Sequence, residues 1–391
     1  MNILLYIWYF VQAILALILI FPVLSYIIYL LKPKSQPLAD ITPNNDYGII
    51  VTAYKFTGNL NNVIDSLLQL KYPNYHVYVV ADDCEGYSYH KTDNKLSVLH
   101  PVVVLKNQIK SHFYAIDNFV RPHNIVTIID SDNIVQPNYL NGLEVYFRQG
   151  FQAVQGVRKA KNHNTVYACL DAINELYYLL YDRIVLFGIG SSAMLSGSGM
   201  AFTTELYREC LGNSNTSGAG FDKVLQNKIL SRNLRIAFAK DAVVYDEKTA
   251  DPNQLVKQRA RWNNTWFKYF HYSLNLMWKG IKSFSINQFL YGFILFRPPL
   301  FILVTLCCLM LIINLFTNIS LAIVWSILLV VFVIGFINAL IKLKAEKKLY
   351  MALLHIPKFM VLQFASLFKA KKANELSVAT EHSYHLEPEK K

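Results

Sequence analysis

The chain contains few charged residues and few cysteines. Of its 391 residues, 16% are Asp, Glu, Lys or Arg, against roughly 25% in soluble domains. Hydrophobic residues make up 53%, which excludes a disordered chain, because such chains contain too few apolar residues to form a core. The five cysteines form no Cys-x-x-Cys pair. Their odd number and spacing predict neither a disulfide framework nor a zinc site, and they fit a reducing compartment.

The apolar surplus lies in three long runs. Residues 3–31 carry no charged side chain, and two further runs cover about 298–316 and 321–341. About 20 helical residues cross the hydrocarbon core of a bilayer, so each run predicts a transmembrane helix. No basic residue precedes the first run. We therefore expect a retained anchor there rather than a cleaved signal peptide.

The formal net charge of +12 gives these helices an orientation. Basic residues flank the runs on what would be one side of the membrane: Lys32, Lys34, Arg297, Lys342, Lys344, Lys347 and Lys348. Lys and Arg accumulate on the cytoplasmic side of membrane proteins. We expect the N-terminus outside and residues 32–290 and the C-terminus in the cytoplasm, at the inner or plasma membrane. The lysines flank spans instead of forming one patch, so we expect lipid contacts and no nucleic-acid partner.

The chain divides into segments of different composition. Residues 349–368 are apolar but contain His355, Pro357 and Lys358, which favours a broken interfacial helix over a fourth span. The expected organisation is a transmembrane helix over 1–31, a linker over 32–45, a cytoplasmic domain over 46–280, an interfacial helix over 281–297, two transmembrane helices over 298–341, a basic segment with an interfacial helix over 342–370, and a cytoplasmic tail over 371–391.

The cytoplasmic segment alternates strand and helix patterns. Strands are expected at Tyr47–Thr52, His76–Ala81, Ser97–Leu105 and Ile125–Ile129, with a helix over Asn59–Leu70. Alternation of this kind predicts a Rossmann-like α/β domain with a mostly parallel sheet. Ligands bind beyond the carboxyl ends of the strands in such sheets.

Acidic clusters follow two of these strands. Asp82-Asp83 comes after the second expected strand, and Asp130-Ser131-Asp132 comes after the fourth. A lone Asp in such a place is usually an N-cap or turn residue. Two carboxylates on one extended segment instead form a hard oxygen site for Mg²⁺ or Mn²⁺, and such an ion can bridge the phosphates of a nucleotide.

Five motifs stand in the order found in one enzyme family. They are Asp82-Asp83, Asp130-Ser131-Asp132, Ser196-Gly197-Ser198-Gly199-Met200, Phe221-Asp222-Lys223-Val224-Leu225 and Gln258-Arg259-Ala260-Arg261-Trp262. Over about residues 47–270 the chain resembles family 2 glycosyltransferases with the GT-A fold, of the membrane-bound processive synthase type. The last motif matches the QxxRW signature of cellulose, chitin and hyaluronan synthases. The layout is most similar to the chitin-oligosaccharide and poly-N-acetylglucosamine synthases.

The resemblance implies a nucleotide and metal site. Tyr54, Asp82 and Asp83 would contact the nucleoside. Asp132 would be the more direct metal ligand, and Asp130 would lie near the ribose or a metal-bound water. A packed turn aromatic is the alternative explanation for Tyr54.

The resemblance also implies a catalytic base and an acceptor site. Asp222 stands where the family has its base, although Gly220-Phe221 replaces the usual Thr-Glu before it. Arg261 would pair with the diphosphate. The residues implied to contact the acceptor are Gln258, Trp262, Ser198 and Gly199. The alternative for Gln258, Arg261 and Trp262 is an amphipathic helix at the membrane interface.

These implications predict an inverting, metal-dependent enzyme. It would transfer a sugar from a UDP-sugar to a growing saccharide chain, with Mg²⁺ or Mn²⁺ as cofactor. Transfer of a single sugar to a lipid-linked or capsular intermediate is the alternative, and partner subunits for secretion stay open. A transporter is a non-enzyme alternative. It is disfavoured because the spans lack ionisable residues near their centres.

Overall fold

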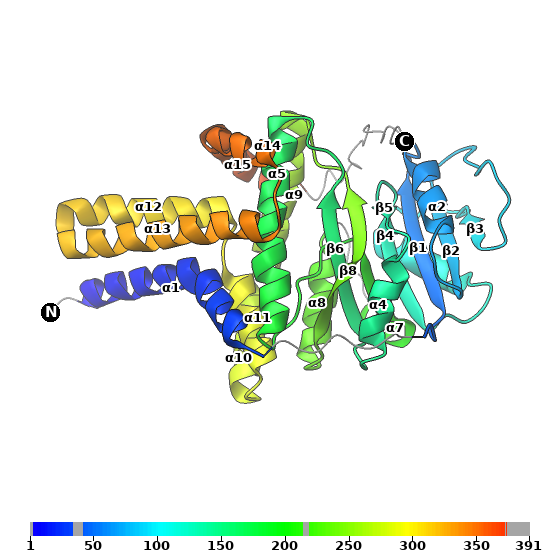
Figure 1. The fold of residues 1–391 in the computed structure, drawn as a ribbon, viewed down its shortest axis with the longest axis horizontal. Coiled ribbons are helices and arrows are strands. Elements are labelled where there is room, and N and C mark those ends of the chain that lie inside the picture. The colour runs from blue at the N-terminus through cyan, green and yellow to red at the C-terminus, as the bar shows by residue number, and fades with distance from the viewer. Residues whose placement is uncertain (1–2, 34–41, 214–218, 372, 374–391) are drawn as a thin grey trace.

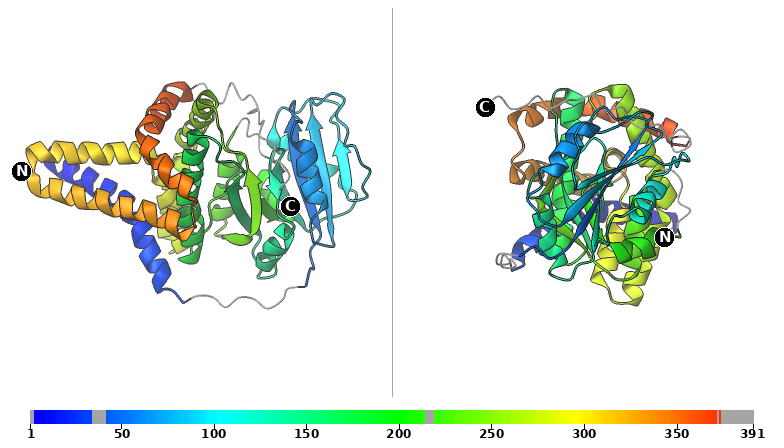
Figure 2. Two further views of the ribbon diagram at one scale, coloured as in Figure 1. Left: turned by 45° about the horizontal axis from the view of Figure 1, so that its top comes forward. Right: turned by 90° about the vertical axis from the view of Figure 1, so that its right-hand side faces the viewer.

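The computed structural model describes residues 3–33, 42–213, 219–371 and 373. Figure 1 shows an elongated molecule with an arm of apolar helices at one end and an α/β domain at the other. A layer of helices lies between them, and the left view of Figure 2 shows the same order. Most of the expected tail over 371–391 and part of the expected linker lie outside the described residues.

One mixed, mostly parallel sheet forms the core of the domain, as predicted. Its strands stand in the order β3-β2-β1-β4-β7-β6-β8-β5. The pairs β1–β2, β1–β4, β2–β3 and β6–β8 are parallel, whereas β7 runs antiparallel between β4 and β6. The strands are β1 (Tyr47–Tyr54), β2 (Tyr75–Asp82), β3 (Leu96–Leu99), β4 (Ile125–Asp130), β5 (Ile134–Val135), β6 (Ala153–Ala160), β7 (Met200–Thr203) and β8 (Ile236–Asp246).

Helices cover both faces of this sheet. Ile49 and Val51 of β1 belong to one hydrophobic core, and Ile50 between them belongs to a second core on the opposite face. Strands buried on both faces read as continuous apolar runs, which is why the strand pattern was visible in the sequence. The helices are α2 (Leu60–Leu68), α3 (Gln108–Asp117), α4 (Tyr139–Phe147), α5 (Val166–Tyr178), a π-helix (Leu179–Val185), α6 (Leu186–Gly188), α7 (Thr204–Leu211) and α8 (Phe221–Ser231).

The third strand is shorter than predicted. β3 ends at Leu99, whereas the apolar pattern continues to Leu105. The Asp82 carboxylate accepts hydrogen bonds from the backbone N–H groups of Leu105 and Lys106, each at 2.9 Å. These bonds draw the segment after β3 into a loop, because the same N–H groups cannot also pair in a strand.

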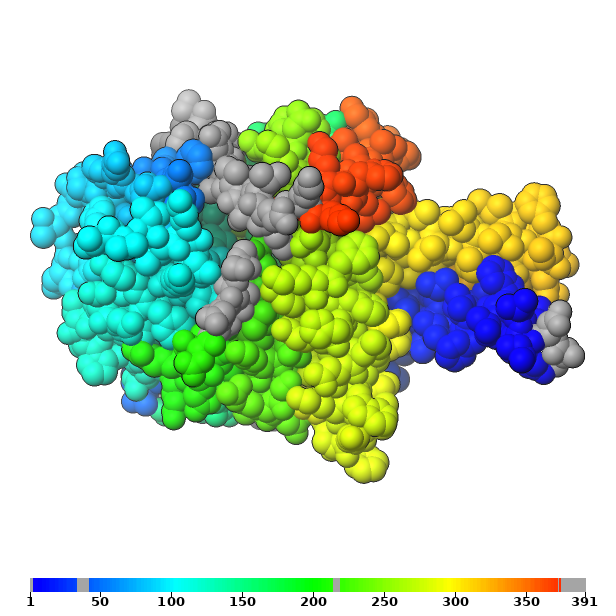
Figure 3. Space-filling view, turned by 180° about the vertical axis from the view of Figure 1, so that it is seen from behind, coloured from blue at the N-terminus to red at the C-terminus, as the bar shows by residue number. Residues whose placement is uncertain are grey.

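The second half of the chain is helical. It comprises α9 (Pro252–Tyr269), α10 (His271–Lys282), α11 (Ile286–Phe296), α12 (Leu300–Thr317), α13 (Ile319–Lys342), α14 (Lys347–Ala352), a 3₁₀ turn (Leu353–His355) and α15 (Ile356–Ala370). Helices α12 and α13 pack against each other and against α1 (Ile3–Leu31) to form the projecting arm (Figure 3). Buried Gln12 accepts hydrogen bonds from Asn314 at 2.8 Å and from Trp325 at 2.7 Å, which joins all three helices.

Among the described residues, four helical stretches are long and apolar enough to cross a membrane. Three are the predicted spans, and the fourth is Lys347–Ala370. This fourth stretch is broken by the 3₁₀ turn, and α15 packs against α9 instead of extending the arm (Figure 2). The expected interfacial helix over 281–297 is also interrupted: α10 ends at Lys282, Phe284 adopts a φ of 51°, and α11 begins at Ile286. Interfacial positions for both segments stay predictions.

Packing of α4 on β8 generates a stability prediction. A Cβ atom at Gly142 of α4 would lie 2.6 Å from the backbone nitrogen of Ala242. Backbone cannot move aside cheaply, so we expect Gly142→Ala to destabilise the domain by about 1–3 kcal/mol. A Cβ atom at Gly58 would meet no atom within 4 Å. Thermal unfolding in detergent should show a lowered Tm for Gly142→Ala only. An equal loss in Gly58→Ala would contradict this account of the packing.

Candidate functional site

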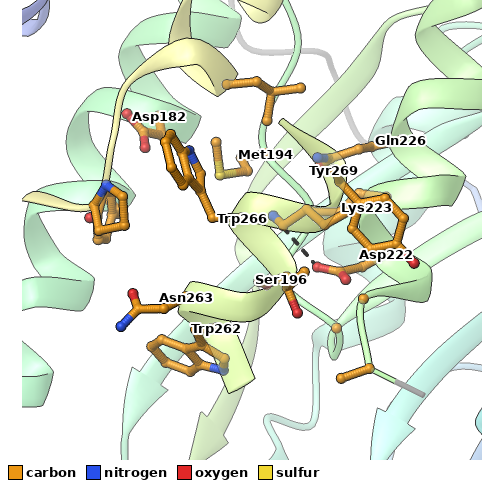
Figure 4. Close-up of a pocket in the computed structure, with 18 of the residues that line it drawn as sticks. Asp182, Met194, Ser196, Asp222, Lys223, Gln226, Trp262, Asn263, Trp266 and Tyr269 are labelled. Atoms are coloured by element: carbon orange, nitrogen blue, oxygen red, sulfur yellow. Dashed lines mark ion pairs between the residues drawn. The ribbon is translucent and has the colours of Figure 1, made fainter. Parts of the chain in front are cut away.

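A pocket of about 440 Å³ lies between the sheet and the layer of helices. Its wall combines residues from segments far apart in the chain, and Figure 4 shows several of them facing one another. They include Asp130 at the end of β4, Ser196 and Gly197 before β7, Asp222 and Lys223 of α8, Trp262 and Trp266 of α9, and Pro298 and Pro299 before α12. The carboxyl end of a parallel strand and an aromatic-lined helix thus share one cavity, as ligand sites in such sheets do.

The turn after β4 is held in place by a buried serine. The Ser198 hydroxyl accepts hydrogen bonds from the Asp130 backbone N–H at 3.1 Å and from the Asn133 amide at 2.7 Å. The Lys161 ammonium donates to the Asp132 carbonyl at 2.5 Å. Asp130 and Asp132 therefore lie on a turn that is tied down from two directions.

Ser198 and Gly199 face this turn and lie outside the pocket lining, whereas Ser196 and Gly197 line the pocket. Gly199 has a φ of 67°, and a Cβ atom there would lie 3.1 Å from Val244 Cγ2. Ser198 thus supports the Asp130 turn, and its neighbours Ser196 and Gly197 form the wall.

The predicted nucleoside contacts gather at the ends of β1 and β2. Tyr54 and Asp82 are register partners in the sheet. Asp82 is buried and its carboxylate holds the loop after β3, whereas Asp83 is partly exposed and forms an ion pair with Lys55 at 3.5 Å. Asp83 is therefore the more accessible carboxylate of the pair.

Unusual backbone conformations mark the same edge of the sheet. Lys55, Asp83 and Lys106 all have positive φ angles, at 63°, 55° and 48°. Such conformations are costly for residues with a side chain, and they concentrate at functional sites. This cluster favours the end of β1 and β2 as part of the site.

Asp222 lies in the first turn of α8 with its carboxylate in the pocket (Figure 4). Lys223 forms an ion pair with it at 3.6 Å. Gly220 precedes the helix with a φ of 97°, and a Cβ atom there would lie 2.8 Å from Tyr269 and from Thr265. Glycine thus lets α9 approach closely and form the opposite wall.

Helix α9 presents a different arginine to the pocket than the motif suggested. Trp262 lines the pocket, but Gln258 and Arg261 are not among the lining residues. Burial lowers the pKa of the Arg261 guanidinium. Arg259 lines the pocket instead, pairs with Asp171 and lies 4.3 Å from the Trp262 ring centre. Helical spacing was the available signal, because residues 259, 262, 263 and 266 share one face of a helix.

A network of buried ion pairs lies in and behind the pocket wall. Arg158 donates to the Ser196 carbonyl at 2.6 Å and pairs with Asp246. Burial alone would raise the pKa of the Asp246 carboxyl, but Arg158 and Lys248 outweigh burial and lower it. The network continues from Lys248 to Glu175 at 3.9 Å and from Glu175 to Arg183 at 2.6 Å.

The sequence analysis did not identify this network. A signal was present, because Asp182-Arg183 interrupts a strongly apolar stretch. These two residues lie in the π-helix and both line the pocket. Asp182 pairs with Arg297 at 2.5 Å. π-helical turns are rare and frequently occur at functional sites.

The chain matches the model of the family described as "Glycosyltransferase like family 2" over residues 43–265. No curated protein sequence matches it. Among solved structures it is similar to the mannosyltransferase PcManGT from Pyrobaculum calidifontis in complex with GDP-Man and Mn²⁺. That structure is 16% identical, has a TM-score of 0.55, and the match covers 91% of this chain and 99% of that chain.

A second similar structure is TarS 1-349 from S. aureus. It is 14% identical, with a TM-score of 0.40, and the match covers 63% of this chain and 71% of that chain. The same fragment in complex with UDP-GlcNAc is 15% identical, with a TM-score of 0.39 and coverage of 62% and 74%. The likeness to PcManGT shows the shared GT-A fold.

The buried network generates a prediction that depends on pH. Burial raises the pKa of Glu175, but Arg183, Lys248 and Arg158 lower it further than burial raises it, so its folded-state pKa lies below the ordinary value. Its stabilisation is therefore present above that ordinary value and is lost as the pH falls below about 4. We expect Glu175→Gln to cost about 3–5 kcal/mol at neutral pH, because two buried cations lose a partner.

Chemical denaturation in detergent at several pH values would measure this cost. The control is Asp117→Asn, which breaks an exposed ion pair with Arg208 and should cost under about 1 kcal/mol. A cost for Glu175→Gln no larger than that of the control, or one that grows below pH 4, would contradict the stabilising role of the network.

Proposed function

Because the chain belongs to the glycosyltransferase-like family 2, we propose that it transfers a sugar from a UDP-sugar to an acceptor hydroxyl, with inversion, at the cytoplasmic face of a membrane. One observation supports this most: the carboxylates of Asp222 and Asp130 line the same pocket as Trp262 and Trp266. A base, a candidate metal ligand and flat apolar surfaces for a sugar ring therefore border one cavity.

Asp130 and Asp132 fit a Mg²⁺ or Mn²⁺ ion. Both supply hard carboxylate oxygens on a turn that Ser198 and Lys161 hold in place. Among the described residues, no group of three or more His, Cys, Asp or Glu side chains could hold a metal. A Mg²⁺ site commonly uses only one or two carboxylates, with water and the substrate phosphates as further ligands. The ion, when bound, would neutralise charge on the leaving diphosphate.

Asp222 performs the proton transfer in this proposal. Its carboxylate accepts the proton of the acceptor hydroxyl while the hydroxyl oxygen attacks C1 of the sugar. The bond between C1 and the diphosphate oxygen breaks, and the nucleoside diphosphate leaves with the electron pair. A single displacement inverts C1, so an α-linked donor yields a β-linked product. Trp262 would stack on the acceptor sugar, whereas Arg261, predicted to pair with the diphosphate, does not line the pocket.

The nucleobase of the sugar donor is proposed from the sequence resemblance. Tyr54 and Asp83 lie at the edge where a nucleoside would bind, and UDP is the predicted nucleotide. Because the similar PcManGT structure contains GDP-Man, GDP-sugars belong in the same assay.

The arm of helices favours the alternative of single-sugar transfer over extension of a polymer. Gln12, Asn314 and Trp325 are buried between the three helices of the arm, where Asn314 and Trp325 both donate to Gln12. The pocket also reaches the start of α12, at Pro298, Pro299, Leu300 and Phe301. Both features suit an acceptor that stays at the membrane surface, whereas a growing chain would need a route onward or partner subunits.

Replacement of the proposed base tests the reaction. Purified full-length protein should release UDP from one donor of a panel of UDP- and GDP-sugars, in the presence of Mg²⁺ or Mn²⁺. Asp222→Asn should lower the rate by about 10²–10⁴-fold, the usual contribution of a general base. The variant should still bind UDP, and Asp117→Asn should retain full activity. Asp222→Asn with near-normal turnover would remove Asp222 from the mechanism.

Removal of the Ser198 hydroxyl tests the support of the metal site. Ser198→Ala leaves the Asp130 N–H and the Asn133 amide without their acceptor. We expect a several-fold rise in the Mn²⁺ concentration needed for half-maximal turnover, with recovery at high Mn²⁺. Ser283→Ala, on an exposed turn, is the matched control. A reduced rate that added Mn²⁺ does not restore would count against this role of Ser198.

A further inference from the structure

The pocket reaches the membrane side of the molecule. From Asp222 it extends past Trp266 to Pro298 and Pro299, and it includes Leu300 and Phe301 of α12. Helix α12 is one of those long enough to cross a membrane. Figure 1 shows its start where the arm meets the layer of helices. An apolar ligand could therefore enter this end of the pocket from the bilayer.

Two buried arginines line the same end. Arg297, directly before Pro298, pairs with Asp182, and Arg259 pairs with Asp171. Each is more than nine-tenths buried. Arg297 Nη1 and Arg259 Nε have no hydrogen-bond partner among the described residues. A buried guanidinium nitrogen without an acceptor is costly, unless a ligand supplies the acceptor.

From these observations we infer that the acceptor is an anionic membrane lipid with a free hydroxyl. Its phosphate or similar group binds at Arg297 and Arg259, its apolar chain lies along Pro298, Pro299, Leu300 and Phe301, and its hydroxyl reaches Asp222. This inference rests on the proposed function, because a bound lipid is an acceptor only if the protein is a glycosyltransferase. The binding site itself requires only the pocket and the two arginines.

The donor diphosphate does not account for these two arginines. It would bind near Asp130 and Asp132, the candidate metal ligands on the turn after β4. Figure 4 shows Asp182, the partner of Arg297, on the opposite side of Trp266 from Asp222. The Trp266 indole donates to the Arg297 carbonyl at 3.1 Å and thereby fixes the arginine beside the aromatic wall. Arg297 therefore belongs to the acceptor end of the pocket.

Calorimetric titration of the full-length protein in an uncharged detergent tests the site without turnover. The probes are dodecyl phosphate, dodecanol and inorganic phosphate. We expect dodecyl phosphate to bind at least tenfold more tightly than either of the others, because only this probe has both an anionic group and an apolar chain. If dodecanol binds as tightly, the site does not recognise an anionic group. If inorganic phosphate binds as tightly, the site does not recognise an apolar chain.

A charge-neutral double variant locates the binding. Arg297→Gln with Asp182→Asn removes both members of the pair and so leaves no unpaired charge in the wall. It should bind dodecyl phosphate at least tenfold more weakly than the unmodified protein. Lys282→Gln, which removes an exposed cation at the end of α10, should bind dodecyl phosphate as the unmodified protein does. If the double variant does not fold, Arg259→Gln with Asp171→Asn serves the same purpose. Unchanged binding in a folded double variant would overturn the site.

Titration of UDP with Mn²⁺ on the same proteins separates the two proposals. The double variant should bind UDP as the unmodified protein does. Failure of every nucleotide sugar to bind, alongside tight binding of dodecyl phosphate, would reject the proposed function and leave the lipid site standing.

Discussion

Buried ion pairs surround the pocket where the α/β domain meets the apolar helices, and the geometry of the pocket depends on them. Asp182 in the π-helix pairs with Arg297, which lies shortly before α12. Asp246 of β8 holds Arg158, which in turn holds the carbonyl of Ser196 in the pocket wall. Pairs of this kind contribute little net stability, because desolvation offsets their attraction, but a broken pair is costly. Loss of one member of such a pair would therefore disturb the packing around the pocket.

The glycines and tryptophans of the pocket follow from that constraint. With α9 held against α8, the position directly before α8 has no room for a side chain, and Gly220 occupies it. Trp262 and Trp266, one turn apart on α9, then face the carboxylate of α8 across the cavity. The polar groups of the sheet edge and the aromatic side chains of α9 thus meet in one pocket.

Much of the fold was predictable from the sequence, and less of the site was. The apolar strands and spans were visible because burial on all sides leaves continuous runs of apolar residues. Asp130, Asp222 and Trp262, which the sequence analysis assigned to the site, line the same pocket, and their roles stay predictions. The expectation for Ser198 concerned the acceptor, yet its hydroxyl supports the Asp130 turn. A one-dimensional motif cannot distinguish a residue that forms a wall from its neighbour that holds the wall in place.

The sequence alone determined the apolar spans, the α/β alternation and the acidic residues after the strands, because each depends on residues close together in the chain. Only the tertiary structure decided which charges face the pocket. Arg259 rather than Arg261 lines it. Arg297 also lines it and pairs with Asp182, which lies 115 positions earlier in the chain. Such contacts depend on the angle at which α9, the π-helix and α12 pack together. That angle is set by buried ion pairs between distant segments, which no local pattern of residues records.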